Sequence, residues 1–118
     1  MSPTIILKDG QPFAVLGTPG GNRIITTMVQ VISNLIDFGM DMESAVEAPR
    51  LYNDVMNLLH YEARINEETI KKLIDRGQEC KKFKDWDRFF GGVQGIIYQN
   101  KKMIGVADSR RDGRAVGC

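Results

Sequence analysis

Two short apolar runs open the chain and predict a β-hairpin. They cover residues 4–7 (TIIL) and 13–16 (FAVL), and the residues between them include Asp9-Gly10, a dipeptide typical of type I′ hairpin turns. Because each run is apolar at nearly every position, we expect both faces of this hairpin to be buried. A tight glycine-rich turn, residues 17–21 (GTPGG), is predicted to follow the second strand.

Apolar residues then recur at helical spacing and predict a helix over residues 22–38. Gly39 directly after it is suited to the left-handed conformation in which many helices end. Asp41 is placed to cap a second, short helix over residues 42–48, and Pro49 ends that helix.

The middle of the chain predicts one strand and one further helix. Residues 58–64 (LLHYEAR) read as a strand. Asn66 is placed to cap the helix that follows, and Gly77 to close it. Ile65 and Ile70 have the spacing of a hydrophobic staple around that cap.

A second hairpin is predicted near the end of the chain, with strands over residues 93–99 and 102–107 and a turn at Asn100-Lys101. The order ββ, α, α, β, α, ββ is dominated by hairpins, so we expect an α+β fold with mainly antiparallel strands. No internal repeat, low-complexity tract or linker interrupts residues 1–118, which we interpret as a single domain.

Composition and charge narrow the classes of function. A net charge of +1 gives no electrostatic case for a nucleic-acid or membrane-surface partner. No apolar run approaches the roughly 20 residues of a membrane span, and the first residues lack the pattern of a signal peptide. The two cysteines, Cys80 and Cys118, are too few for a disulfide scaffold, and we interpret both as plain thiols.

The turn at residues 17–21 is the strongest candidate for chemistry. Gly20 and Gly21 lack Cβ atoms, so their N–H groups can approach a ligand closely at the start of a helix. Such a turn can hold a phosphate, a carboxylate or the oxyanion of an acyl transfer, or it can be only a turn. No Gly-Lys-Ser/Thr follows and the glycines lack the G-x-G-x-x-G spacing, which excludes a Walker A motif and a dinucleotide fingerprint.

Several blocks of sequence, in order along the whole chain, resemble γ-glutamyltranspeptidases. They are Ser2-Pro3-Thr4-Ile5, Lys8-Asp9-Gly10, Gly17-Thr18-Pro19-Gly20-Gly21-Asn22-Arg23-Ile24-Ile25, Ala45-Val46-Glu47-Ala48-Pro49-Arg50, and Gly105-Val106-Ala107-Asp108-Ser109-Arg110-Arg111-Asp112-Gly113. The resemblance implies the C-terminal part of the small subunit, within an αββα sandwich of the N-terminal nucleophile hydrolase type that cleaves its own precursor.

In that family a threonine exposed by self-cleavage attacks the γ-glutamyl carbonyl, and two glycine N–H groups hold the oxyanion. By resemblance these glycines are Gly20 and Gly21, which would serve in both catalysis and substrate binding. The γ-glutamyl enzyme then passes its acyl group to water, an amino acid or a dipeptide. The resemblance implies no cofactor or metal, and a periplasmic or extracellular location.

The family's nucleophile, the residues that bind the substrate's amino group and a serine pair that contacts its carboxylate all lie upstream of the segment covered here. Ser2 is not one of that pair, Thr18 replaces the more usual serine, and Ser109 replaces a proline. We therefore expect the chain alone to be inactive and its partner to be the upstream portion of the enzyme. Missing strands should leave apolar faces open, so we expect a homo-oligomer if the chain is isolated.

Other polar residues have simpler interpretations. His60 is predicted to be a partly buried structural histidine, and Thr26 and Thr27 lack the free amino group of a processed nucleophile. We predict a structural cluster at Asp108, Arg110, Arg111 and Asp112 and a solvated face at Lys71, Lys72, Lys81, Lys82 and Lys84. The aromatic residues Trp86, Phe89 and Phe90 either fill the core, which is the default interpretation, or meet a partner surface. Alternative functions are a related cephalosporin acylase, a capsule-type transpeptidase, or a non-catalytic remnant that self-associates.

Overall fold

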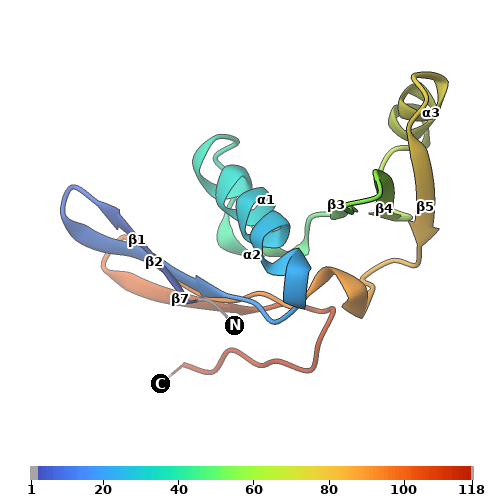
Figure 1. Ribbon diagram of the computed structural model, residues 1–118. Coiled ribbons are helices and arrows are strands. Elements are labelled where there is room, and N and C mark those ends of the chain that lie inside the picture. Colours follow the sequence, from blue (N-terminus) through green and yellow to red (C-terminus); the bar gives the residue numbers. More distant parts are fainter. Residues whose placement is uncertain (1–2, 118) are drawn as a thin grey trace.

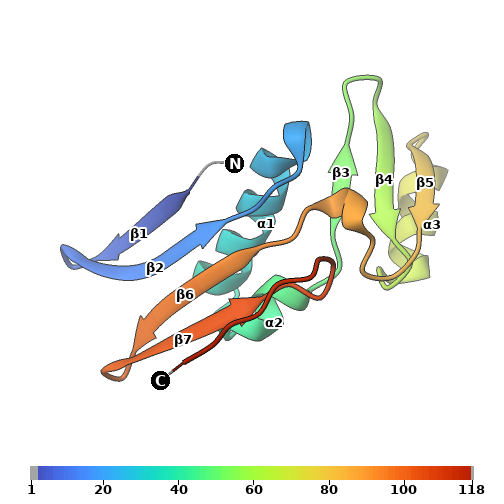
Figure 2. The same cartoon turned by 90° about the horizontal axis from the view of Figure 1, so that it is seen from below.

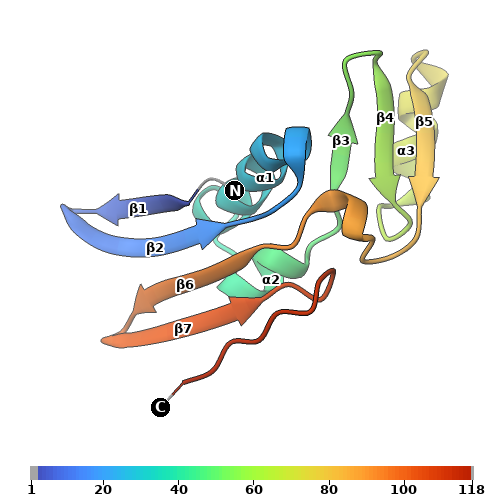
Figure 3. The ribbon, with the colours of Figure 1, turned by 60° about the horizontal axis from the view of Figure 1, so that its bottom comes forward.

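The computed structural model describes residues 3–117, in which the strands form two sheets (Figures 1 and 3). The elements in chain order are β1 (Thr4–Lys8), β2 (Gln11–Gly17), the 3₁₀ turn η1 (Gly21–Arg23), α1 (Ile24–Ile36), α2 (Met42–Glu47), β3 (Leu51–Asn53), β4 (Leu58–Glu62), α3 (Glu67–Asp75), β5 (Glu79–Phe83), the 3₁₀ turn η2 (Arg88–Phe90), β6 (Gln94–Gln99) and β7 (Lys102–Ala107). Ser2 and Cys118, discussed above, lie outside the described residues.

The larger sheet has four antiparallel strands in the order β1-β2-β6-β7. Both of its hairpins turn where the sequence predicts. Asp9 and Gly10 have φ angles of 52° and 75°, and Asn100 and Lys101 have 52° and 60°. Positive φ at both central residues defines the type I′ turn, whose twist matches that of the flanking strands.

Helices α1 and α2 cover one face of this sheet, and the main apolar core lies between them (Figure 2). Its buried members are Ala14, Leu16, Met28, Val31, Leu35, Met42, Ala45, Val46, Val93 and Ile97. The predicted first helix is present but shorter at both ends, and Gly39 beyond it has a φ of 63°. Asp41 caps α2 by accepting a hydrogen bond from the Ser44 N–H, as predicted.

The opposite face of the larger sheet is open, which corrects the expectation that the hairpin is buried on both faces. The side chains of Ile5 and Leu7 are 64% and 61% exposed, and Val15 is also exposed. Alternate residues of a strand point to opposite faces, and both helices lie on the same one. Figure 2 looks onto the open face, where the C-terminal segment runs beside β7.

The smaller sheet has the order β3-β4-β5, in which β3 and β4 are antiparallel and β4 and β5 are parallel. Helix α3 makes the crossover between these two strands. Asn66 caps this helix by accepting from the N–H groups of Glu68 and Thr69, and Gly77 ends it with a φ of 89°. Ile70 is buried, while its stapling contact with Ile65 stays a prediction.

Strands β3 and β5 were absent from the sequence-based interpretation. β3 has three residues, and β5 (ECKKF) is mostly polar, so neither shows a clear apolar period. The mixed α+β class with mostly antiparallel strands is nevertheless confirmed. Within residues 3–117 no helix is long and apolar enough to cross a membrane.

Candidate functional site

The glycine loop (residues 17–23) leads from β2 into α1, as the sequence predicts. Gly20 has φ 152° and ψ 8°, and Gly21 has φ 58°. A residue with a Cβ atom rarely adopts either conformation, so both positions favour glycine. The chain then makes the 3₁₀ turn η1 and enters α1 directly.

The N–H groups of Gly20 and Gly21 are free for a ligand, because no hydrogen bond found within residues 3–117 is donated by either. The Gly20 carbonyl accepts from the Arg23 N–H at 3.2 Å, which tightens the turn. The 13-residue helix α1 starts here without an acidic residue in its first turn. Unpaired N–H groups and the positive end of the helix dipole together favour a negative charge at this loop.

Arg23 lies in the same loop and is held by the chain that precedes β6. Its Nε donates to the Phe89 carbonyl at 2.6 Å, and its guanidinium lies 4.3 Å from the centre of the Phe89 ring. This contact combines a hydrogen bond with a cation–π interaction. The positive charge of Arg23 is therefore fixed beside the glycine loop.

The glycine loop rests on residues 89–93, which we call the supporting segment. The Thr18 side chain is fully buried, and its hydroxyl accepts from the Gly92 N–H at 3.0 Å and donates to the Pro19 carbonyl at 2.8 Å. A Cβ atom on Gly91 would lie 2.6 Å from the Thr18 Oγ1 and 2.9 Å from the Pro19 oxygen. Only glycine at position 91 lets the two backbones come this close.

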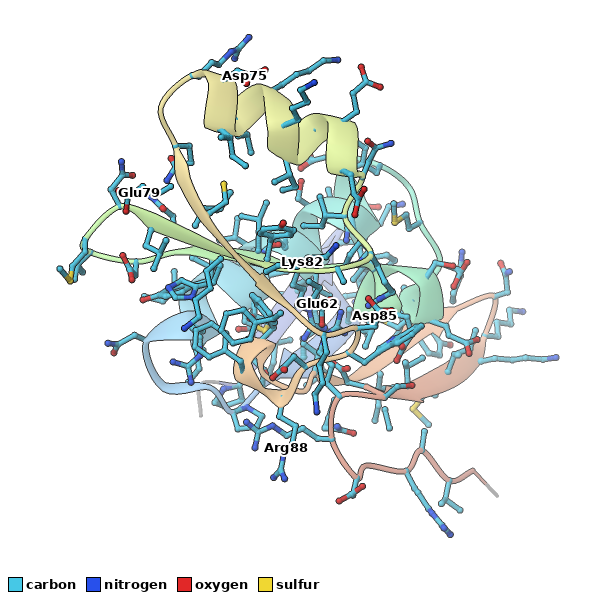
Figure 4. All side chains as sticks on the ribbon, turned by 90° about the vertical axis from the view of Figure 1, so that its right-hand side faces the viewer. Glu62, Asp75, Glu79, Lys82, Asp85 and Arg88 are labelled. Carbon is cyan, nitrogen blue, oxygen red and sulfur yellow. The ribbon has the colours of Figure 1, made fainter. Side chains whose placement is uncertain are left out.

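Beneath the supporting segment lies a buried cluster of four charged side chains. Arg50 and Asp108 are joined at 2.7 Å, and Arg110 contacts Asp108 at 3.0 Å and Glu62 at 2.7 Å. In Figure 4, Glu62 lies in the middle of the molecule, whereas Arg88 is at its edge. Each carboxylate thus faces a buried arginine, and the Arg64 Nη2 also contacts the Glu62 Oε2 at 3.2 Å.

The cluster holds the supporting segment at two points. The Arg50 Nη1 donates to the Phe90 carbonyl at 3.0 Å, and the Val93 N–H donates to the Asp108 Oδ2 at 2.8 Å. Burial by itself raises the pKa of Asp108, but the charge of Arg50 and the N–H of Arg110 outweigh it and lower that pKa overall. Asp108 is therefore held in its ionised form.

The remaining candidates from the sequence fall into structural roles. His60 is buried, its Nε2 lies 3.0 Å from the Asp54 Oδ2, and its ring packs against Phe89. Phe90 is buried as predicted, but Trp86 is exposed and carries the Arg64 guanidinium on its ring, so its core assignment is wrong.

Other charged groups follow the predictions in part. The five lysines of the predicted solvated face, Lys71, Lys72, Lys81, Lys82 and Lys84, are exposed. The structural cluster near the C-terminal end is present, but its members are Asp108 and Arg110 rather than Arg111 and Asp112. Thr27 donates to the Phe90 carbonyl at 3.1 Å, and Thr26 donates to the Arg23 carbonyl.

Sequence reasoning missed the burial of Glu62 and the contact of the supporting segment with the glycine loop. Glu62 ends a strand that was predicted, but nothing in its neighbours indicates that it is fully buried. The Gly91-Gly92 pair was the one signal available, because consecutive glycines often mark a close backbone approach. Its partner across that contact, Thr18, lies more than 70 residues earlier in the chain.

The mixed α+β fold with mainly antiparallel strands places the glycine loop between β2 and α1. The gamma-glutamyltranspeptidase family model matches residues 1–118, and the chain belongs to that family. It is 39% identical over 119 residues to the glutathione hydrolase proenzyme of Bacillus subtilis, a match that covers 99% of this chain and 20% of that protein. The chain thus spans about a fifth of the length of this curated relative.

Solved structures agree with this assignment. Gamma-glutamyltranspeptidase from Pseudomonas nitroreducens complexed with L-DON superimposes with a TM-score of 0.84 at 34% identity, covering 100% of this chain and 61% of that one. Cephalosporin acylase from Bacillus halodurans superimposes with a TM-score of 0.87 at 27% identity, and the match covers 95% of this chain and 21% of that one. The fold is therefore shared with solved proteins whose names indicate different acyl substrates.

Proposed function

We propose that this chain is the C-terminal part of a γ-glutamyltransferase or glutathione hydrolase and that its glycine loop forms the oxyanion hole. The observation that carries the proposal is the pair of unused N–H groups on Gly20 and Gly21 at the positive end of α1. Family membership and the name of the Bacillus subtilis relative support the choice of γ-glutamyl amides such as glutathione as substrates.

The proposed reaction uses a threonine supplied by the upstream portion of the enzyme. Its hydroxyl oxygen bonds to the γ-carbonyl carbon, the carbonyl π electrons move to oxygen, and the hydroxyl proton passes to the threonine's amino group. Gly20 and Gly21 donate their N–H groups to the resulting oxyanion. Collapse of the intermediate breaks the C–N bond, and the leaving amine takes the proton. Water or an acceptor amine then releases the γ-glutamyl group from the ester.

The upstream portion is also the proposed partner for the open sheet face. The chain spans about a fifth of its relative and 61% of a solved transpeptidase chain, which supports a larger enzyme whose remainder can cover this face. Family members are often exported, and we propose a periplasmic or extracellular location on that basis alone. The isolated chain is expected to turn over no substrate, because the nucleophile lies upstream.

A graft tests the proposal. The matching segment of the Bacillus subtilis glutathione hydrolase proenzyme is replaced by this chain, and the product is called the grafted enzyme below. Release of a chromogenic amine from a γ-glutamyl anilide and self-cleavage into two subunits are then measured. We expect both. An enzyme that assembles and cleaves itself but never releases the amine would contradict the proposed substrate class.

A matched pair of glycine variants tests the oxyanion role. Gly21 and Gly39 have φ angles of 58° and 63°, flank α1, and leave open space around an added Cβ. Gly21→Ala and Gly39→Ala should therefore cost similar stability. Only Gly21→Ala places strain and a methyl group on a residue that supplies a proposed donor, and we expect it to lower kcat by roughly 100-fold. Equal kcat in the two variants would argue against the oxyanion assignment.

The second candidate function is a cephalosporin acylase, which the similarity to the Bacillus halodurans enzyme favours. The glycine loop contacts the oxyanion and not the acyl chain, so it fits either substrate. Measuring hydrolysis of a side-chain-acylated cephalosporin by the grafted enzyme distinguishes a cephalosporin acylase from a γ-glutamyltransferase or glutathione hydrolase. Preference for that substrate over the γ-glutamyl anilide would favour the acylase.

A further inference from the structure

We propose that the Thr18 hydroxyl is a positioning group that fixes the direction of the Gly20 N–H. This inference rests on the proposed function, because it concerns how one donor of the oxyanion hole is aimed. Thr18 does not itself contact the reacting atoms. It acts through the peptide unit that joins Pro19 to Gly20.

The peptide unit between Pro19 and Gly20 is planar, so its C=O and N–H turn together. The Thr18 Oγ1 donates to the Pro19 oxygen at 2.8 Å. The peptide bond between Pro19 and Gly20 is trans, as are all those described. In a trans peptide the C=O and the N–H point in opposite directions. A hydroxyl that holds the Pro19 carbonyl on the buried side therefore turns the Gly20 N–H toward the other side.

Glycine makes such a restraint necessary. Rotation of the Pro19–Gly20 peptide changes ψ of Pro19 and φ of Gly20, and glycine tolerates nearly any φ. The observed φ of 152° at Gly20 is thus not imposed by local sterics. No atom crowds the Cα of Gly20 either, since an added Cβ would meet its nearest atom at 3.6 Å. The hydroxyl supplies the restraint that the residue lacks.

The hydroxyl is itself held in place. Its oxygen accepts from the Gly92 N–H at 3.0 Å, which leaves its proton directed at the Pro19 carbonyl. Gly92 lies between Phe90, whose carbonyl accepts from Arg50, and Val93, whose N–H is bound by Asp108. Two hydrogen bonds, from Gly92 to Thr18 and from Thr18 to Pro19, therefore connect the Pro19–Gly20 peptide to the segment that the buried ion cluster holds.

Three variants of the grafted enzyme separate positioning from simple stability. Thr18→Val removes the hydroxyl at nearly constant volume, and Thr18→Ser retains it. Thr27→Val is the matched control, because Thr27 is also buried and also donates to the supporting segment, at the Phe90 carbonyl, but does not touch the Pro19–Gly20 peptide.

We expect Thr18→Val to lower kcat by roughly 10- to 100-fold with KM nearly unchanged, because a misaimed donor weakens transition-state binding only. Thr18→Ser should have a kcat close to that of the unsubstituted grafted enzyme. Thr27→Val should also retain that kcat, while its thermal midpoint falls about as far as that of Thr18→Val. An unchanged kcat in Thr18→Val, or an equal loss in Thr27→Val or Thr18→Ser, would overturn the inference.

A crystal structure of the Thr18→Val grafted enzyme gives a readout that needs no activity. The inference predicts a rotated or disordered Pro19–Gly20 peptide, and an unchanged peptide would overturn it. Failure of the unsubstituted grafted enzyme to acylate would count against the proposed function instead, and the crystal structure would still decide the role of Thr18.

Discussion

The guanidinium of Arg110 holds the carboxylate of Glu62 through two parallel hydrogen bonds, from Nε to Oε1 and from Nη2 to Oε2, each 2.7 Å long. Both side chains are 0% exposed, and 48 residues separate them in the chain. The pair ties the segment after β7 to the end of β4. It thereby joins the larger sheet to the smaller one, next to the supporting segment that the same ion cluster holds.

Removing one partner of this pair should be far more damaging than breaking an exposed ion pair. Arg110→Met leaves Glu62 charged and buried with less compensation, which typically costs about 3–5 kcal/mol. We expect a marked drop in the thermal midpoint of the grafted enzyme. The control is Glu68→Gln, which breaks an exposed pair with Lys72 that is 2.9 Å long and should change the midpoint little. Similar drops in both variants would contradict the burial argument.

Asp108 should make the fold sensitive to acid. Its pKa is lowered in the folded state, so its ionised form adds stability above the unfolded-state pKa near 3.8. That stability is lost as the pH falls from about 4 through the lower folded-state pKa. The Asp108→Asn variant should have a lower free energy of unfolding than the unsubstituted protein at about pH 7. Its free energy of unfolding should also fall less between about pH 4 and about pH 2.

Urea unfolding followed by Trp86 fluorescence across this pH range checks the acid dependence. Asp112→Asn is the matched control, because Asp112 is exposed and lies four residues along the same segment, outside the cluster. It should keep the unsubstituted profile. An Asp108→Asn profile parallel to that of the unsubstituted protein would refute the linkage.

Local signals account for the parts of the fold that the sequence predicted. Asp9-Gly10 specifies its turn through two positive φ angles, and Asn66 specifies a helix start through its own side-chain hydrogen bonds. These contacts span a few residues, so the sequence alone contains them. The position of the glycine loop between β2 and α1 was predictable for the same reason.

Long-range contacts account for what was missed. Glu62 is part of a charged strand end, and its burial depends on Arg110, which sequence patterns cannot pair with it. Strand β5 (ECKKF) forms because β4 offers a parallel edge, not because of its own apolar period. The open sheet face was misjudged because apolar strands indicate burial without indicating which chain segment provides the cover.

Gly91 should be intolerant of a side chain for steric reasons beyond its backbone angle. Its φ of 88° is close to the 89° of Gly77, but its ψ of −153° places Gly91 in a region of backbone conformation that is essentially restricted to glycine. A Cβ at Gly77 meets nothing within 4 Å, whereas at Gly91 it meets Thr18 and the Pro19 carbonyl. We expect Gly91→Ala to lower the amine-release rate strongly and Gly77→Ala to leave it close to normal. Comparable rates in the two variants would contradict the close approach.

The open face of the larger sheet carries a continuous apolar row. Ile5 pairs with Val15, and Val15 pairs with Ile96, so these three side chains cross neighbouring strands on one side. Tyr98 and Met103, also exposed, extend the row along β6 and β7. An apolar patch of this kind favours association with another surface.

A charge in the middle of this row should prevent that association. Ile96 is 48% exposed on the open face, and Ile74 is 52% exposed on α3, away from it. We expect the isolated chain and its Ile74→Lys variant to sediment as oligomers, and Ile96→Lys to sediment as a monomer, because burying a lysine against apolar residues is costly. When mixed with a separately produced upstream portion, Ile96→Lys should also fail to restore amine release, while Ile74→Lys should restore it. A monomeric unsubstituted chain would show that the open face does not drive self-association, and full activity with Ile96→Lys would show that the upstream portion does not cover it.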